Sequence, residues 1–122
     1  IQPAILSLRE TKGRIIITSS GAAVNAYAGW GSYGAAKAAL NHLVHSLSIE
    51  EPLITSIAVR PGIVDTKMQD EVRGYYEIMD HADVEKFRSL HLEKRLLRPE
   101  QPGDVMARLV LCAGRELSGK FF

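Results

Sequence analysis

The chain has 122 residues, 46% of them hydrophobic, and its 15 basic and 14 acidic side chains leave a formal net charge of +1. This composition is that of one ordinary globular domain, and because no basic block and no apolar run of about 20 residues occurs, it indicates neither nucleic acid nor a membrane as a partner. Cys112 is the single cysteine, which excludes an intrachain disulfide and predicts a cytoplasmic location.

The first fifty residues predict a helix, a strand and a second helix. Residues 3–10 have the pattern of a helix end, and residues 14–20 form a β-branched run without polar alternation, which is typical of a parallel strand covered on both faces. A loop of small residues, 21–31, precedes a helix over 32–50. Its apolar side chains recur at helical spacing: Ala36, Leu40, Leu43, Val44 and Leu47. The other side of this helix is mostly alanine, glycine and serine.

A second strand follows that helix. Pro52 ends the helix, and residues 53–59 predict a strand that is closed by Arg60, Pro61 and Gly62. A strand, a helix and a strand of these lengths make one βαβ unit, which implies a parallel pair with a right-handed crossover. The predicted fold class is therefore α/β, with a doubly wound parallel sheet between helical layers.

The segment 67–98 is charged and aromatic and predicts helices without a strong strand. Its apolar side chains form either the inside of a lid over a site or the packing of a peripheral helix pair, and both interpretations stay open. These side chains are Met68, Tyr75, Tyr76, Met79, Phe87 and Leu90. Pro99 and Pro102 then introduce a helix over 103–113, and residues 119–122 predict the start of a last strand.

Reactive side chains meet at one edge of the predicted sheet, because ligands of open parallel sheets bind beyond the carboxyl ends of the strands. Ser20 ends the first strand, segment 61–66 leaves the second, and Tyr33 and Lys37, four residues apart, share one face of the helix between them. Adding a hydride to a carbonyl carbon makes an alkoxide that needs a proton. The Tyr33 phenol can supply this proton if the Lys37 ammonium and the helix N-terminus favour its anion, while the Ser20 hydroxyl holds the substrate oxygen.

The motif spacing resembles the short-chain dehydrogenase/reductase family over nearly the whole chain. The motifs are Thr18-Ser19-Ser20, then Tyr33-Gly34-Ala35-Ala36-Lys37 thirteen residues further on, then Arg60-Pro61-Gly62-Ile63-Val64-Asp65-Thr66. The resemblance implies a Rossmann-type, three-layer α/β/α fold. It implies that Ser20 polarises the substrate, that Tyr33 is the general acid/base, and that Lys37 favours the phenolate and binds the nicotinamide ribose.

The same resemblance implies a nicotinamide site. Pro61 and Gly62 would border the nicotinamide, and the Val64 backbone and the Thr66 hydroxyl would bind its carboxamide. Thr66 has a second interpretation as a simple cap of the following helix. Trp30 is expected either to wall the substrate pocket or to pack the loop before Tyr33.

Three runs are most similar to fungal members related to sepiapterin and benzil reductases: residues 19–23, 29–34 and 64–69. This narrower resemblance implies NADP(H) rather than NAD(H), and an NADPH-dependent reductase of ketones or diketones. The family resemblance also implies a homodimer or homotetramer, assembled through the small-residue side of helix 32–50 and the helix that ends near Glu10; a simply exposed face is the alternative for that side.

Several family features belong upstream of Ile1: the glycine-rich turn, the residue that selects NAD or NADP, an Asn-Asn-Ala-Gly stretch and the catalytic Asn. A family member runs to about 250 residues as one domain. We therefore expect residues 1–122 to be the C-terminal catalytic portion of such a domain, with roughly the first half and a short C-terminal tail missing, and not to bind a dinucleotide tightly alone.

Other functions fit the sequence less well. Gly29–Gly34 matches G-x-G-x-x-G, but about nine residues separate it from the first strand, and a hydrolase elbow around Ser32 would need glycine where Trp30 stands. No metal site is predicted, because the histidines lack ligand spacing: His42, His45, His81 and His91. A non-catalytic NAD(P)-binding protein is one alternative, against which the intact Ser20, Tyr33 and Lys37 argue. A truncated interaction module is another, which the mass of the protein would decide.

Overall fold

The computed structural model describes residues 1–74 and 77–122. Their elements in chain order are η1 (Gln2–Ala4), α1 (Ile5–Thr11), β1 (Arg14–Thr18), η2 (Gly21–Ala23), α2 (Gly31–Glu50), β2 (Thr55–Val59), α3 (Lys67–Gly74), α4 (His81–Leu92), α5 (Glu100–Cys112) and η3 (Arg115–Leu117). The predicted order of helices and strands is confirmed. Tyr75 and Tyr76, two of the predicted lid residues, lie outside the described residues.

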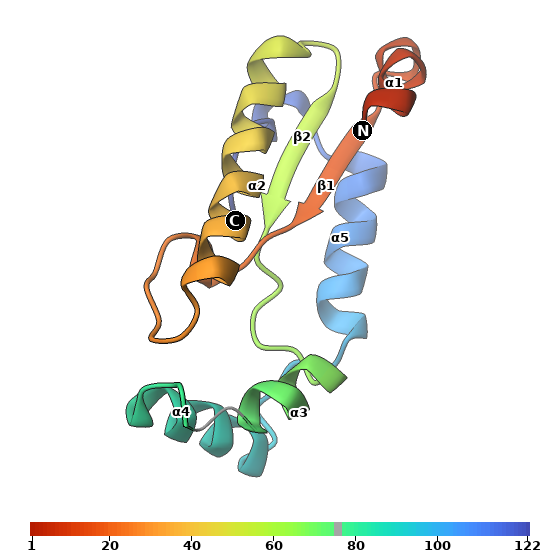
Figure 1. Ribbon diagram of the computed structural model, residues 1–122. Helices are drawn as coiled ribbons and strands as arrows, with labels where there is room; N and C mark the ends of the chain where they lie inside the picture. Colours follow the sequence, from red (N-terminus) through yellow and green to blue (C-terminus); the bar gives the residue numbers. More distant parts are fainter. Residues whose placement is uncertain (75–76) are drawn as a thin grey trace.

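The two strands form the parallel pair that the βαβ pattern predicted. Ile16 lies opposite Ile57 in the register of β1 and β2, and α2 makes the crossover between them (Figure 1). The C-terminal residues come back to the free side of β2, where Phe121 makes a parallel bridge with Ala58. The predicted last strand is therefore present as one bridge, supported by a hydrogen bond from the Phe122 amide to the Ala58 carbonyl (3.0 Å).

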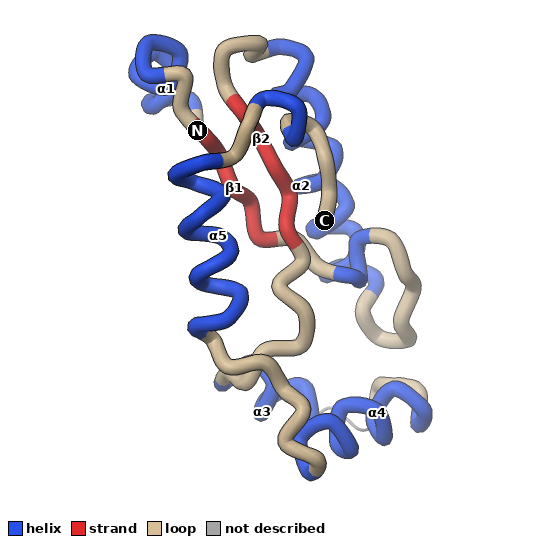
Figure 2. Tube along the Cα trace, turned by 180° about the vertical axis from the view of Figure 1, so that it is seen from behind, coloured by secondary structure: helices blue, strands red, loops and turns tan. Residues whose placement is uncertain are grey.

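Helices cover β2 from both sides, so its two polar residues, Thr55 and Ser56, are buried together with the apolar ones. All five residues of β2 are buried. Ile57 and Val59 pack with Ala113 and with α5 side chains on one face, whereas Ser56 points to the other face and donates a hydrogen bond to the Val44 carbonyl in α2 (2.9 Å). Figures 1 and 2 show α2 and α5 on either side of the strand pair. The side chains of β2 thus point alternately towards α5 and towards α2, as expected for a strand between two helical layers.

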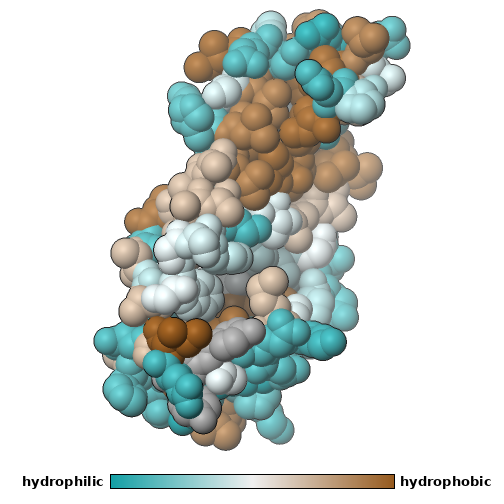
Figure 3. Space-filling model, in the orientation of Figure 1, coloured by the Kyte–Doolittle hydropathy of each residue, from teal (hydrophilic) through white to brown (hydrophobic). Residues whose placement is uncertain are grey.

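The strand β1 is less enclosed. Within the described residues it pairs with β2 only, and its residues are half-buried except for the exposed Thr18. Hydrophobic side chains gather at the level of the two strands on the face that Figure 3 shows. The second edge of β1 is therefore open to a further strand.

A second apolar cluster lies beyond the carboxyl ends of the strands. Met79, Val84 and Phe87 are buried together, and three half-buried side chains pack against them: Trp30, Ile63 and Val72. This cluster joins α3 and α4 into one unit, which Figure 1 places past the arrowheads of β1 and β2. The unit therefore faces the edge of the sheet where the sequence predicts the site.

An ion pair connects α1 to the end of α2. Arg9 binds Glu51 with two hydrogen bonds, from Nε to Oε2 (2.7 Å) and from Nη2 to Oε1 (2.6 Å). The hydrogen bonds from Arg9 are the main cause of a lowered pKa of the Glu51 carboxyl; burial opposes this shift and the Arg9 charge adds to it. None of the described helices is long and apolar enough to span a membrane.

Candidate active site

The chain turns sharply after β1, and this turn places Ser20. The Ser20 Oγ accepts a hydrogen bond from the Ala22 amide (3.2 Å) and so caps the short helix η2. Because this bond uses an oxygen lone pair, the Ser20 hydroxyl proton remains able to donate to a ligand. The predicted strand therefore ends two residues early, at Thr18, and the two serines belong to the turn.

The first two turns of α2 carry Tyr33 and Lys37. The Lys37 ammonium donates a hydrogen bond to the Thr18 carbonyl at the end of β1 (2.9 Å) and lies 5.7 Å from the centre of the Tyr33 ring. Between them, Gly34 lets α2 approach η2 closely, because a Cβ at this position would lie 2.8 Å from the Ala22 carbonyl oxygen. The absence of a side chain at Gly34 thus lets the first turn of α2, which carries Tyr33, lie against the turn that carries Ser20.

The loop after β2 is fixed by the segment that precedes α5. Gly62 has a φ of +83°, a backbone conformation that favours glycine, and a Cβ there would lie 2.8 Å from Leu97 Cδ1, the end of a side chain that could turn aside. Leu97 also pairs with Val64: its amide donates to the Ile63 carbonyl (2.9 Å), and its carbonyl accepts from the Asp65 amide (2.8 Å).

Thr66 ends this loop at the start of α3. Its hydroxyl donates to the Val64 carbonyl (3.4 Å), while its own carbonyl accepts from the Gln69 amide (2.8 Å). Both interpretations of the Thr66 hydroxyl, as a ligand group and as a cap of α3, therefore stay open.

All eight residues that the sequence singled out line one cavity of about 810 Å³. They are Ser20, Trp30, Tyr33, Lys37, Pro61, Gly62, Val64 and Thr66. The cavity lies beyond the carboxyl ends of β1 and β2, as expected for an open parallel sheet. Helices α3 and α4 supply part of its wall, and the residues around the start of α5 supply another part.

Several lining residues had no site role predicted from the sequence, and the larger polar ones among them are Tyr27, Gln69, Arg60 and Lys86. Tyr27 lies in the loop before α2, and Lys86 directly precedes the buried Phe87 in α4. The only signal that could have indicated Lys86 is this position next to an apolar residue of the lid segment. Gln69 lies three residues after Thr66 and is 9% exposed.

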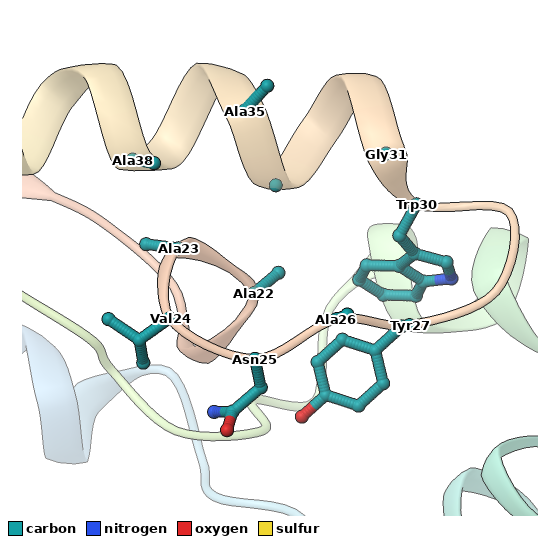
Figure 4. A pocket seen from close by; sticks show the side chains of 11 residues that line it. Ala22, Ala23, Val24, Asn25, Ala26, Tyr27, Trp30, Gly31, Ala35 and Ala38 are labelled. Carbon is teal, nitrogen blue, oxygen red and sulfur yellow. The ribbon is translucent and has the colours of Figure 1, made fainter.

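A smaller hollow of about 350 Å³ lies between η2 and the start of α2 (Figure 4). Its lining is mostly alanine and glycine, and Tyr27 and Trp30 are its aromatic members. Both rings also line the larger cavity. Because Ser20, Tyr33 and Lys37 all line the larger cavity, the larger cavity is the candidate active site.

Residues 2–76 match the family model of the short chain dehydrogenases. The chain belongs to the short-chain dehydrogenase family. An oxidoreductase of Schizosaccharomyces pombe is 42% identical over 123 residues, which cover 99% of this chain and 50% of the relative. A benzil reductase ((S)-benzoin forming) of Saccharomyces cerevisiae is 41% identical over 81% of this chain and 39% of the relative.

The crystal structure of the KRED1-Pglu enzyme has a TM-score of 0.95 and 38% sequence identity, over 99% of this chain and 51% of that chain. The family and the Rossmann-type α/β fold predicted from the motifs are thus confirmed. Sepiapterin reductase of Rattus norvegicus also matches, at 39% identity over 48% of this chain. The chain spans about half the length of the curated relatives it matches.

The family uses NAD(P), and the cavity fits such a cofactor. Two buried oxygens on its wall, Ser19 Oγ and Gln69 Oε1, have no hydrogen-bond partner in the described part of the chain. Unpartnered buried oxygens are rare and indicate that a polar ligand completes the site. The charged residues that line the cavity are Lys37, Arg60 and Lys86, and none of the described lining residues is acidic. This positive lining suits a negatively charged dinucleotide.

The described residues contain no group of three His, Cys, Asp or Glu side chains that could hold a metal ion. The cavity wall carries a serine, a tyrosine and a lysine, together with the loop that follows β2.

Proposed function

We propose that the protein containing this chain is an NADPH-dependent reductase of ketones or diketones. The observation that carries the proposal is the convergence of Ser20, Tyr33, Lys37 and the loop 61–66 on one cavity. The benzil reductase of Saccharomyces cerevisiae, 41% identical to the chain, supports a carbonyl substrate. In the whole protein, Lys37, Pro61, Gly62, Val64 and Thr66 would hold the nicotinamide and its ribose.

A bound nicotinamide supplies the hydride that reaches the carbonyl carbon. The carbonyl oxygen then receives the electron pair of the C=O π bond, and the chain's own residues stabilise and protonate this oxygen. Ser20 donates a hydrogen bond to this oxygen and holds it beside Tyr33. The Tyr33 hydroxyl transfers its proton to the oxygen, which gives the alcohol and leaves a phenolate that takes a proton from solvent. The same groups catalyse the reverse reaction.

Lys37 stabilises the charge that this proton transfer leaves on Tyr33. Its ammonium lies 5.7 Å from the ring centre and is held there by the Thr18 carbonyl. A positive charge near the phenolate lowers the free energy of the charged state. The lid role proposed for segment 67–98 adds exclusion of water, since α3 and α4 line the cavity.

The decisive test is the rate of NADPH and NADH oxidation by the complete protein over a panel of aliphatic ketones, aryl ketones and 1,2-diketones. We expect turnover with at least one carbonyl class and faster oxidation of NADPH. Binding of NADPH without turnover of any member would instead support the non-catalytic alternative, and faster NADH oxidation would reverse the cofactor assignment.

We further propose a homodimer or homotetramer that assembles through α1 and α2 in the cytoplasm. The outer face of α2 carries exposed small side chains, Ala35, Ala36 and Ala39, together with the 39%-exposed Leu43. Ala36 and Leu43, which the helical spacing grouped with the buried Val44 and Leu47, are thus exposed. Small residues allow helices of two subunits to approach closely. A charge placed there by Leu43→Glu should reduce the molar mass measured by light scattering to that of the monomer.

A further inference from the structure

The Trp30 side chain makes ring contacts with three other aromatic residues of the cavity wall. The centre of the Trp30 ring lies 5.7 Å from that of Tyr27 and 5.4 Å from that of Tyr33, with the Tyr33 ring in a T-shaped arrangement. It lies 6.0 Å from the centre of the Phe87 ring, which is stacked on it with ring planes that differ by 8°. Figure 4 shows the Trp30 and Tyr27 rings close together at the start of α2. These separations are within the range of favourable aromatic pairs.

Phe87 comes from a different part of the fold. It is 7% exposed and belongs to the buried cluster with Met79 and Val84 in the α3–α4 unit. Its position is therefore set by the packing of α4 and does not depend on a ligand. Because Trp30 stacks on this fixed ring, the orientation of the indole beside Tyr33 depends on α4.

The cavity consequently has a polar side and an aromatic side. Ser20, Lys37 and Thr66 line the polar side, while the linked rings and neighbouring apolar side chains such as Val72 line the other. A flat aryl group gains more from packing against aromatic rings than a saturated ring of equal size, and such pairs favour the aryl group by about two- to ten-fold in binding. The aromatic side therefore suits an aryl substituent next to the reacting carbonyl.

We propose that Phe87 is a positioning residue for substrate specificity: its stack on Trp30 fixes the indole plane against which the aryl group of an aryl ketone packs. The proposal rests on the proposed carbonyl reduction and deepens it. Phe87 acts through Trp30, so its loss affects the choice between substrates more than the proton transfer at Tyr33.

The test compares acetophenone with cyclohexyl methyl ketone, which share the carbonyl group and differ in ring type. In the complete protein we expect Phe87→Leu to lower the ratio of the two kcat/KM values by two- to ten-fold, mainly by raising KM for acetophenone. Phe87→Tyr keeps the stack and should restore the ratio. Val84→Ala is the matched control, because Val84 is buried on the same helix in the same cluster. This substitution should lower the kcat/KM values of the two ketones by the same factor, so that their ratio stays constant.

A ratio that Phe87→Leu leaves unchanged, or changes no more than Val84→Ala does, would overturn the proposal. A second measurement does not need turnover. The fluorescence difference between the complete protein and its Trp30→Phe variant isolates the Trp30 signal, and acetophenone should change it saturably, with weaker binding in Phe87→Leu. If no ketone or diketone of the panel is reduced, the proposed function fails, while a saturable titration still supports the aryl site. A purely linear, collisional response would reject the aryl site itself.

Discussion

The Lys37 ammonium lies 2.9 Å from the carbonyl oxygen of Thr18, so a side chain of α2 is tied to the end of β1. A lysine on a helix surface has great rotational freedom, and a hydrogen bond to a main-chain carbonyl removes much of it. Lys37 is thereby kept near the Tyr33 ring before any ligand binds, and its position depends on the strand as well as on the helix.

Lys37→Met should impair both binding and turnover, because it removes a positive charge and a hydrogen-bond donor together. We expect kcat/KM to fall by about 10²-fold or more, within the range of general acid–base contributions, and the Kd of NADPH to rise in a fluorescence titration. Lys120→Met is the control, since Lys120 is exposed and does not line the cavity. Wild-type rates in Lys37→Met would remove Lys37 from the mechanism.

Tyr33→Phe isolates the proton transfer. The variant keeps the ring and thus its T-shaped contact with Trp30, but it has no proton to give. We expect kcat to fall by about 10²- to 10⁴-fold with little change in melting temperature. Tyr27→Phe loses the same hydroxyl from another ring of the cavity wall and should retain most of the activity; equal losses in the two variants would contradict the special role of Tyr33.

A side chain at Gly62 should destabilise the fold. In Gly62→Ala the residue must hold a φ of +83°, and its Cβ meets Leu97 Cδ1 at 2.8 Å. We expect a loss of about 1–3 kcal/mol in the free energy of unfolding, measured by denaturant unfolding. The double variant Gly62→Ala/Leu97→Ala separates the two causes: relief of the contact would return part of the loss, and the backbone part would remain.

The Arg9–Glu51 pair predicts a pH-dependent stability. The pKa of Glu51 is lowered from its ordinary value of 4.5, mainly by the hydrogen bonds from Arg9. The pair's contribution is therefore fully present above this value and is lost as the pH falls through the lower folded pKa. Glu51→Gln should be less stable than the wild type at neutral pH, and the two melting temperatures should converge on acidification; a constant difference would exclude this linkage.

The sequence predicts the motif residues of the site better than it predicts the contacts among the other residues that line the cavity. Ser20, Tyr33, Lys37 and loop 61–66 follow from the strand–helix–strand order, because a parallel unit must bring these ends together. The stack of Trp30 on Phe87 has no such local cause: the residues are far apart in the chain, and only the packing of α4 brings the rings together.

The ends of helices are also predicted less well than their order along the chain. The helix predicted over 103–113 begins earlier, at Glu100. Pro99 and Pro102 were interpreted as residues that precede the helix, yet proline is tolerated in the first turn, where its missing amide needs no partner. Pro99 is instead the N-cap residue, and Pro102 lies within the first turn.

The one-sided pairing of β1 has a consequence for how the cavity is kept in shape. Ser19 and Ser20 follow β1 directly, so the position of both serines depends on how firmly that strand is held. A neighbouring strand bound along the open edge would supply main-chain hydrogen bonds to β1 and would bring its own loop to the same rim. Ser19 and Ser20 are therefore held through the pairing of β1 with its neighbouring strands. A change that weakens this pairing should slow the proposed reaction without altering any side chain that would touch the substrate.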